Sequence, residues 1–84
     1  MHYVYILRSR KDGNLYIGCT HNLPKRVALH NAGGVPSTKD RKPLVLVYYE
    51  AFINKQDAFT REQWLKTGWG RTHVRKILSN CLKI

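Results

Sequence analysis

The apolar positions of the chain begin with two short β-rich runs, YVYIL at residues 3–7 and LYIGC at residues 15–19. The segment between them contains Asp12-Gly13, a strong signal for a tight turn, so we predict a β-hairpin. If these two residues form a two-residue loop, the numbers of paired residues sum to an odd value. Tyr5 and Tyr16 then lie on the same face of the hairpin, unless a bulge in the turn changes this parity.

The polar positions after the hairpin indicate a helix over residues 23–32. Asn22 is a suitable N-cap, and the glycine pair at residues 33–34 supplies the stop. Arg26 and His30 are four residues apart, so they lie on the same side of this helix. The Gly/Pro/Ser-rich loop that follows carries basic residues, which predicts a mobile, phosphate-attracting segment.

Residues 44–49, LVLVYY, are apolar at every position instead of alternating. An uninterrupted apolar run is typical of a strand that is covered on both faces. We therefore predict that this strand is central in its sheet and that helices pack on both sides of it.

Two more helices are predicted after this strand. Asn54 caps the first, and its apolar line runs through Ala58, Leu65 and Trp69. A break at residues 68–70 precedes the last helix, which has an apolar and a basic face. The apolar face holds Val74, Ile77, Leu78, Cys81 and Leu82, and the basic face holds Arg71, Arg75 and Lys76. The predicted order is thus β-β-α-β-α-α, in one domain spanning residues 1–84.

The charge of the chain adds a partner class. Fifteen Lys and Arg residues against five Asp and Glu give a net charge of +10 in 84 residues. Nucleic acid is the leading partner, because each neutralised phosphate releases counterions. An anionic membrane surface is the weaker reading, since the basic residues do not line one long amphipathic helix. The alternative explanation of this positive charge is that it only keeps the protein soluble. The basic residues expected to contact phosphates are Lys39, Arg41, Arg71 and Arg75.

Cysteine usage and hydropathy limit the location of the protein. Cys19 and Cys81 are the only cysteines, and a zinc site built from them with His21 and His30 would lack the close-paired spacing of structural zinc modules. The first apolar stretch is too short for a signal peptide, and no run reaches the roughly 20 apolar residues of a membrane span. We expect a reduced, cytoplasmic or nucleoid-associated protein with no membrane contact.

Glu62 falls on the apolar line of its helix, where an ionised carboxylate is costly unless a cation compensates it. An arginine salt bridge and a metal ion are equally good partners from position alone. One carboxylate among waters would suit Mg²⁺. Gly18, inside a strand, indicates either a bulge or the close approach of another group.

The remaining candidate residues each have a structural and a chemical reading. Tyr5 and Tyr16 are interpreted either as core residues of a sheet or as a catalytic base, if nearby cations favour the phenolate form. Arg26 is interpreted either as a solvated charge on the helix surface or as a group that binds a phosphate. His30 reads as a packing residue, as a proton acceptor or as a group that orients a tyrosine.

Taken together, the hairpin tyrosines, the YIG at residues 16–18, the helix arginine ten residues after Tyr16 and the later glutamate resemble the GIY-YIG nuclease superfamily. The match is closest to the small single-domain members and spans nearly the whole chain. Two features depart from the family pattern: the first motif reads YVY at residues 3–5, and no asparagine follows Glu62 at the distance seen in several family nucleases.

The resemblance implies a three-stranded antiparallel sheet flanked by helices, and hydrolysis of phosphodiester bonds in DNA with one divalent ion, Mg²⁺ or Mn²⁺. It implies a base role for Tyr16, a supporting role for Tyr5 and phosphate stabilisation by Arg26. His30 matches a position that holds a catalytic His or Tyr, and Glu62 matches the metal-binding glutamate.

Two functions follow from these expectations. The first is a metal-dependent endonuclease in DNA repair, recombination or processing, with a protein partner that could supply targeting. The alternative is a nucleic-acid-binding module that keeps the scaffold with little or no turnover, and the missing asparagine favours it. A purely structural protein has no positive feature in the sequence.

Overall fold

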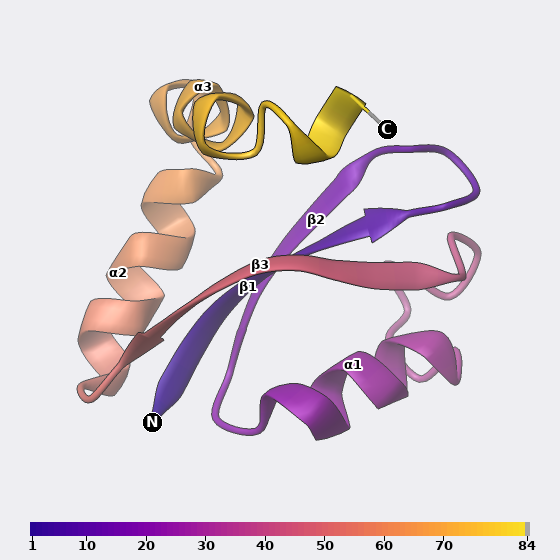
Figure 1. The fold of residues 1–84 in the computed structure, drawn as a ribbon. Coiled ribbons are helices and arrows are strands. Elements are labelled where there is room, and N and C mark those ends of the chain that lie inside the picture. The colour runs from indigo at the N-terminus through magenta and orange to yellow at the C-terminus, as the bar shows by residue number, and fades with distance from the viewer. Residues whose placement is uncertain (84) are drawn as a thin grey trace.

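The computed structural model describes residues 1–83. Its elements are β1 (His2–Ser9), β2 (Leu15–Thr20), α1 (Leu23–Asn31), β3 (Leu44–Phe52), α2 (Lys55–Leu65), α3 (Gly68–Ile77) and a 3-10 helix, η1 (Cys81–Lys83). The strands form one antiparallel sheet in the order β2-β1-β3 (Figure 1). The predicted α+β class, element order and three-stranded antiparallel sheet are therefore confirmed. None of the helices in this described part of the chain is long and apolar enough to span a membrane.

The predicted position of the apolar strand is wrong, because β1 and not β3 is central. The β1 side chains from Val4 to Leu7 are at most 1% exposed, whereas Val45 and Tyr49 on β3 are 39% and 54% exposed. β3 lies at an edge because it joins the side of β1 that the hairpin partner β2 leaves open. Leu46 packs in the core beneath α1, whereas the exposed Tyr49 ring makes an edge contact with Tyr3, at 6.0 Å between ring centroids.

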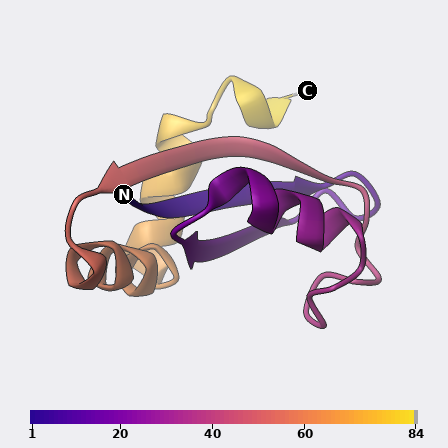
Figure 2. The same ribbon diagram turned by 90° about the horizontal axis from the view of Figure 1, so that it is seen from below.

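Helices cover both faces of the sheet, as predicted. Because side chains alternate along a strand, β1 sends Tyr5 and Leu7 toward α1, and Val4 and Ile6 toward α2 and α3. Figure 1 shows α1 on one side of the sheet and α3 on the other, and Figure 2 shows α1 lying in front of the strands. This alternation places the Tyr5 phenol on the α1 face.

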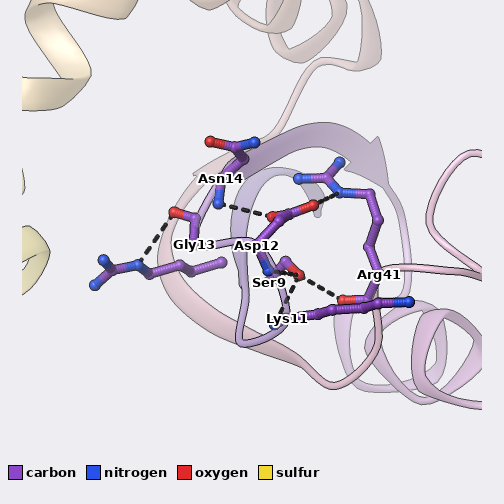
Figure 3. A network of polar contacts seen from close by, with 7 residues as sticks. Ser9, Lys11, Asp12, Gly13, Asn14 and Arg41 are labelled. Atoms are coloured by element: carbon purple, nitrogen blue, oxygen red, sulfur yellow. Dashed lines mark hydrogen bonds and ion pairs between the residues drawn. The ribbon is translucent and has the colours of Figure 1, made fainter.

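The turn of the hairpin is longer than a two-residue loop. The Ser9 amide donates to the Asn14 carbonyl at 3.0 Å, and the Gly13 amide donates back to the Ser9 carbonyl at 2.9 Å. Polar contacts fill this loop, and the Arg41 guanidinium reaches across to Asp12 at 2.9 Å (Figure 3). The register keeps its odd parity all the same, with Tyr5 opposite Gly18, so the prediction that Tyr5 and Tyr16 share a face is confirmed.

The predicted N-caps Asn22 and Asn54 are confirmed, but the boundary between the last two helices differs from the prediction. Thr67 caps α3, so residues 68–70 form its first turn and are not a break. The chain changes direction before that turn, so the spacing from Leu65 no longer applies, and Trp69 is 82% exposed instead of extending the apolar line. A Cβ at Gly70 would overlap the Leu65 backbone, so this glycine lets α2 and α3 cross closely.

The apolar face of the last helix is also shorter than predicted. α3 ends at Ile77, which is exposed, while Val74 and Leu78 are buried. Cys81 and Leu82 still pack against this core, but from η1.

A separate ion pair joins β3 to α2. Glu50 accepts two bonds from Arg61, at 2.8 and 2.9 Å, and a third from the Tyr48 hydroxyl at 2.7 Å. The Arg61 bonds hold the pKa of Glu50 below its usual value. The guanidinium also stacks over Trp64, 5.0 Å from the ring centroid, so this cluster fixes α2 against the sheet.

Candidate active site

Tyr5, Tyr16 and His30, which are distant in sequence, meet between the sheet and α1. The Tyr5 hydroxyl lies 2.8 Å from Nε2 of His30, and the rings of Tyr16 and His30 contact edge to face at 5.0 Å. Tyr5 and Tyr16 are 6.4 Å apart between ring centroids. The hairpin register supplies the two phenols, and the one-turn spacing of α1 places His30 above them beside Arg26.

Arg26 is half-buried and lies beside both phenols of this cluster. Hydrogen bonding to Tyr5 raises the pKa of the guanidinium, which therefore stays charged. Its Nε atom is buried and has no hydrogen-bond partner among residues 1–83. A buried donor without an acceptor is costly, so this position favours a ligand that brings an oxygen.

Burial and the Arg26 charge set the protonation of the two innermost groups. Burial raises the pKa of Tyr5, and the hydrogen bond and charge of Arg26 only partly oppose this. Burial lowers the pKa of His30, and the Arg26 charge lowers it further. Near neutral pH the site therefore holds a neutral imidazole against a protonated Tyr5 phenol.

Gly18 is explained by the Tyr5 ring. A Cβ at position 18 would overlap the Tyr5 hydroxyl, so only glycine lets the phenol lie across β2. The bulge reading of Gly18 is wrong, since the irregularity of the sheet lies between Ile6 and Leu7 in the β1–β3 pairing.

Glu62 is met by a cation, as expected, but the partner is a lysine and not an arginine. Lys66, one turn along α2, lies 2.9 Å from Glu62 Oε2, and the Glu62 side chain is only 12% exposed. The Glu62 charge is the last of the causes that raise the pKa of Tyr5, after burial and the Tyr16 charge. Glu62 also lines a hollow of about 360 Å³ at the end of β2. The other residues of this hollow are His2, Cys19, Thr20, His21, Lys55 and Phe59.

The donors around Glu62 suit one type of metal ion. No group of three or more His, Cys, Asp or Glu side chains in the described chain could hold a metal. The zinc site drawn from sequence is therefore absent there, and His30 is occupied by Tyr5. A single carboxylate facing an open hollow fits Mg²⁺, which keeps several waters and takes few protein ligands.

The four predicted phosphate-binding residues fall in two places. Arg71 and Arg75 line a groove of about 600 Å³ along β2, which Tyr16 also lines. Lys39 is exposed in the loop before β3, and Arg41 is bound to Asp12 on the hairpin turn. The structure thus places one pair on the groove along β2 and the other in the loop before β3.

Sequence reasoning missed two residues of the site. Thr38 is buried with its hydroxyl 2.7 Å from Nδ1 of His30, and Lys66 lines the groove while holding Glu62. The four-residue spacing from Glu62 was a usable signal for Lys66. No periodic signal pointed to Thr38, because it lies in an irregular loop.

The family model for the GIY-YIG catalytic domain matches residues 1–74. The chain belongs to the GIY-YIG family. A UPF0213 protein of Staphylococcus haemolyticus is 52% identical over 67 residues, which cover 79% of this chain and 80% of the relative. A UPF0213 protein of Clostridium perfringens is 44% identical over 84 residues, covering 99% and 89% of the two chains.

A solved structure is similar as well. The solution NMR structure of a UPF0213 protein from Bacillus halodurans has a TM-score of 0.57 and 33% identity, covering 90% of this chain and 83% of the other. The resemblance inferred from the tyrosine motifs is confirmed, and GIY-YIG membership places the chain in a nuclease superfamily. Family membership implies nucleic-acid binding, and nucleases of this family generally use divalent metal ions.

Proposed function

We propose that the protein is a metal-dependent endonuclease that hydrolyses phosphodiester bonds in DNA during repair, recombination or processing, in the cytoplasm or on the nucleoid. The observation that carries the proposal is the convergence of two phenols, a guanidinium and a histidine on one cluster. Within that cluster Tyr16 and Arg26 are half-buried and accessible, whereas Tyr5 and His30 are 0% exposed.

Tyr16 and Arg26 are therefore the groups that touch the substrate. Arg26 binds the phosphate that is cut, through its planar donors and its unpartnered Nε atom. Tyr16 in its phenolate form takes the proton of the attacking water and becomes the phenol, and the adjacent Arg26 guanidinium stabilises the phenolate before this step.

Tyr5 and His30 act through these two residues. Their side chains have no exposed surface, so neither reaches a phosphate in this arrangement. The Tyr5 hydroxyl is held by His30 on one side, and the Arg26 guanidinium lies against it on the other. We assign both residues the role of holding Tyr16 and Arg26 in place.

Glu62 is the proposed ligand of one Mg²⁺ or Mn²⁺ ion. When bound there, the ion supplies positive charge against the phosphate that is cut. The carboxylate itself is largely shielded from solvent, and its present partner is the Lys66 ammonium. Lys66 also lines the groove, so it can remain in the site as a phosphate contact after it leaves Glu62.

The groove along β2 is the proposed path of the nucleic-acid backbone. Its lining includes Lys66, Arg71 and Arg75 together with Tyr16. Phosphate contacts by such residues give affinity without sequence preference. Lys39 and Arg41 would add contacts beyond the hairpin turn, and a protein partner could supply targeting.

The test uses purified protein with branched, nicked and duplex DNA in the presence of Mg²⁺. We expect cleavage that falls by about 10²-fold or more in Tyr16→Phe and Glu62→Gln, because each removes a group needed for proton transfer or charge neutralisation. Tyr48→Phe is the matched control, since the Tyr48 phenol packs on the opposite face of the sheet and bonds Glu50 there. Cleavage that persists unchanged in Tyr16→Phe and Glu62→Gln contradicts the proposal.

One observation favours the alternative of a binding module. The Glu62 carboxylate is already neutralised by Lys66, and the described residues bring no further acid or histidine into a three-residue metal cluster with it. On this alternative the protein binds nucleic acid with strong salt dependence and shows no metal-dependent cutting in the same assay.

A further inference from the structure

Thr38 closes a buried chain of hydrogen bonds that begins at Tyr5. The Tyr5 hydroxyl lies 2.8 Å from Nε2 of His30, and Nδ1 of the same ring lies 2.7 Å from Thr38 Oγ1. The Thr38 hydroxyl in turn lies 3.5 Å from the Val35 carbonyl oxygen. Tyr5, His30 and Thr38 are all 0% exposed, so no solvent can replace a missing partner in this chain.

The donors in this chain have one consistent direction. Besides His30, the side chain within residues 1–83 that hydrogen-bonds the Tyr5 hydroxyl is the Arg26 guanidinium, which has donors and no acceptor. The phenol hydrogen must therefore point at Nε2, which leaves the ring proton of a neutral His30 on Nδ1. That proton is donated to Thr38 Oγ1, and the Thr38 hydroxyl donates to the Val35 carbonyl.

We propose that Thr38 is a positioning residue, which fixes the tautomer of His30 and, through it, the orientation of the Tyr5 hydroxyl beside Arg26. The catalytic consequence rests on the proposed nuclease function, whereas the tautomer is a property of the folded chain whatever it cuts.

The opposite tautomer would place two donors against each other. With the proton on Nε2, the Tyr5 hydroxyl would have to turn its own hydrogen toward the Arg26 guanidinium. That arrangement removes the oxygen lone pair that the guanidinium faces, and burial makes such an unpaired group costly. Arg26 would then have no acceptor on Tyr5 to aim it at the phosphate.

The groups that face the His30 ring support a neutral imidazole. They are Tyr5 from β1, Tyr16 from β2, Arg26 from α1 and Thr38 from the loop before β3. The one charge among them is positive, and burial acts in the same direction. The ring therefore has a single proton, which the Tyr5–Arg26 contact directs to Nδ1 and the Thr38 hydroxyl accepts there.

The test measures both the tautomer and the reaction. Nitrogen-15 NMR of the His30 ring is recorded for the wild-type protein, Thr38→Val and Thr38→Ser, and steady-state cleavage is measured with the same samples. We expect a protonated Nδ1 in the wild type and in Thr38→Ser, and a shift of the proton toward Nε2 in Thr38→Val, which keeps the side-chain shape without the hydroxyl. We also expect Thr38→Val to lower kcat roughly 10- to 100-fold with little change in KM, and Thr38→Ser to restore most of it.

Three outcomes overturn the proposal. The first is a wild-type His30 that carries its proton on Nε2, a result that needs no variant and so does not depend on how Thr38→Val folds. The second is a ring signal that is the same in Thr38→Val and in the wild type. The third is a kcat for Thr38→Val that equals the wild-type value. A wild-type protein that cuts no nucleic acid contradicts the nuclease function instead, while the NMR signals still decide the role of Thr38 in the tautomer.

Discussion

The Tyr5 phenol occupies the space above the Gly18 backbone that any side chain at position 18 would need. The hydroxyl cannot move aside freely, because it is buried and bonded to Nε2 of His30 at 2.8 Å. A strand glycine, which usually weakens a sheet, is therefore the residue that allows the phenol to reach the histidine.

Gly18→Ala should disrupt this arrangement. The added methyl group must displace the Tyr5 ring or the strand, so we expect a loss of about 1–3 kcal/mol in the free energy of unfolding and a fall in cleavage. Urea unfolding and a DNA cleavage assay measure the two effects. Gly68→Ala is the matched control, because a Cβ there meets no atom within 4 Å, and it should stay within about 0.5 kcal/mol of the wild type. Equal stability and activity for Gly18→Ala and Gly68→Ala would show that the close approach of Tyr5 is not needed.

Local rules predicted the parts of the site that depend on periodicity. The odd parity of the hairpin was enough to place Tyr5 and Tyr16 on one face, and the helix spacing was enough to align Arg26 with His30. The loop is two residues longer than predicted, but the numbers of paired residues still sum to an odd value, so the two tyrosines stay on the same face. Only the resemblance to GIY-YIG nucleases connected Glu62 with them.

Other parts depend on how elements pack, which no local pattern records. The apolar run at residues 44–49 suits an edge strand as well as a central one, because α1 covers only part of it and leaves Tyr49 exposed. Trp69 continues the apolar spacing of α2 along the sequence, but the chain turns before it. Thr38 reaches His30 from a loop, so only the folded chain brings the two together.

His30 should make the stability of the fold sensitive to mild acid. Burial and the Arg26 charge lower the pKa of the ring below its ordinary value of 6.5, so the folded state favours the neutral form. The contribution of the neutral ring is complete above that value and is lost progressively as the pH falls toward the lower pKa of the folded state. Unfolding free energies measured by urea titration at several pH values should therefore decrease below about pH 6.5.

The variant His30→Gln separates this effect from other titrations. Glutamine is neutral at every pH in this range, so the variant should be less stable near neutrality but should lose less of its stability on acidification. A wild-type protein and a His30→Gln variant with parallel pH profiles would show that another group causes the acid sensitivity.

The groove along β2 predicts which cations bind the nucleic-acid backbone. Arg71→Gln combined with Arg75→Gln should weaken binding to duplex DNA. The slope of log affinity against log salt should fall by about 0.9 for each phosphate that the variant no longer neutralises. Fluorescence anisotropy at several salt concentrations measures both quantities.

Lys39→Gln combined with Arg41→Gln is the matched comparison, because it removes the same formal charge from the loop before β3. We expect a smaller effect from this pair, since Arg41 is already bound to Asp12 at 2.9 Å. Equal slopes for the two double variants would contradict a path that runs mainly along the groove.

Lys66 links the proposed metal site to the groove, because its ammonium holds Glu62 at 2.9 Å and its side chain lines the groove beside Tyr16. A cation that binds Glu62 competes with the charge of this ammonium, so the Lys66→Met variant should bind Mn²⁺ about two- to fivefold more tightly, as expected for the loss of a partly exposed ion pair. The same change removes a positive charge from the groove, and DNA affinity should fall. Titration of Mn²⁺ in the absence of DNA, followed by electron paramagnetic resonance, measures the first effect.

Lys76→Met on α3 is the control for net charge alone, since no ion pair links Lys76 to Glu62 in the described part of the chain. If both variants tighten Mn²⁺ binding equally, the ion pair between Lys66 and Glu62 does not control access to the carboxylate.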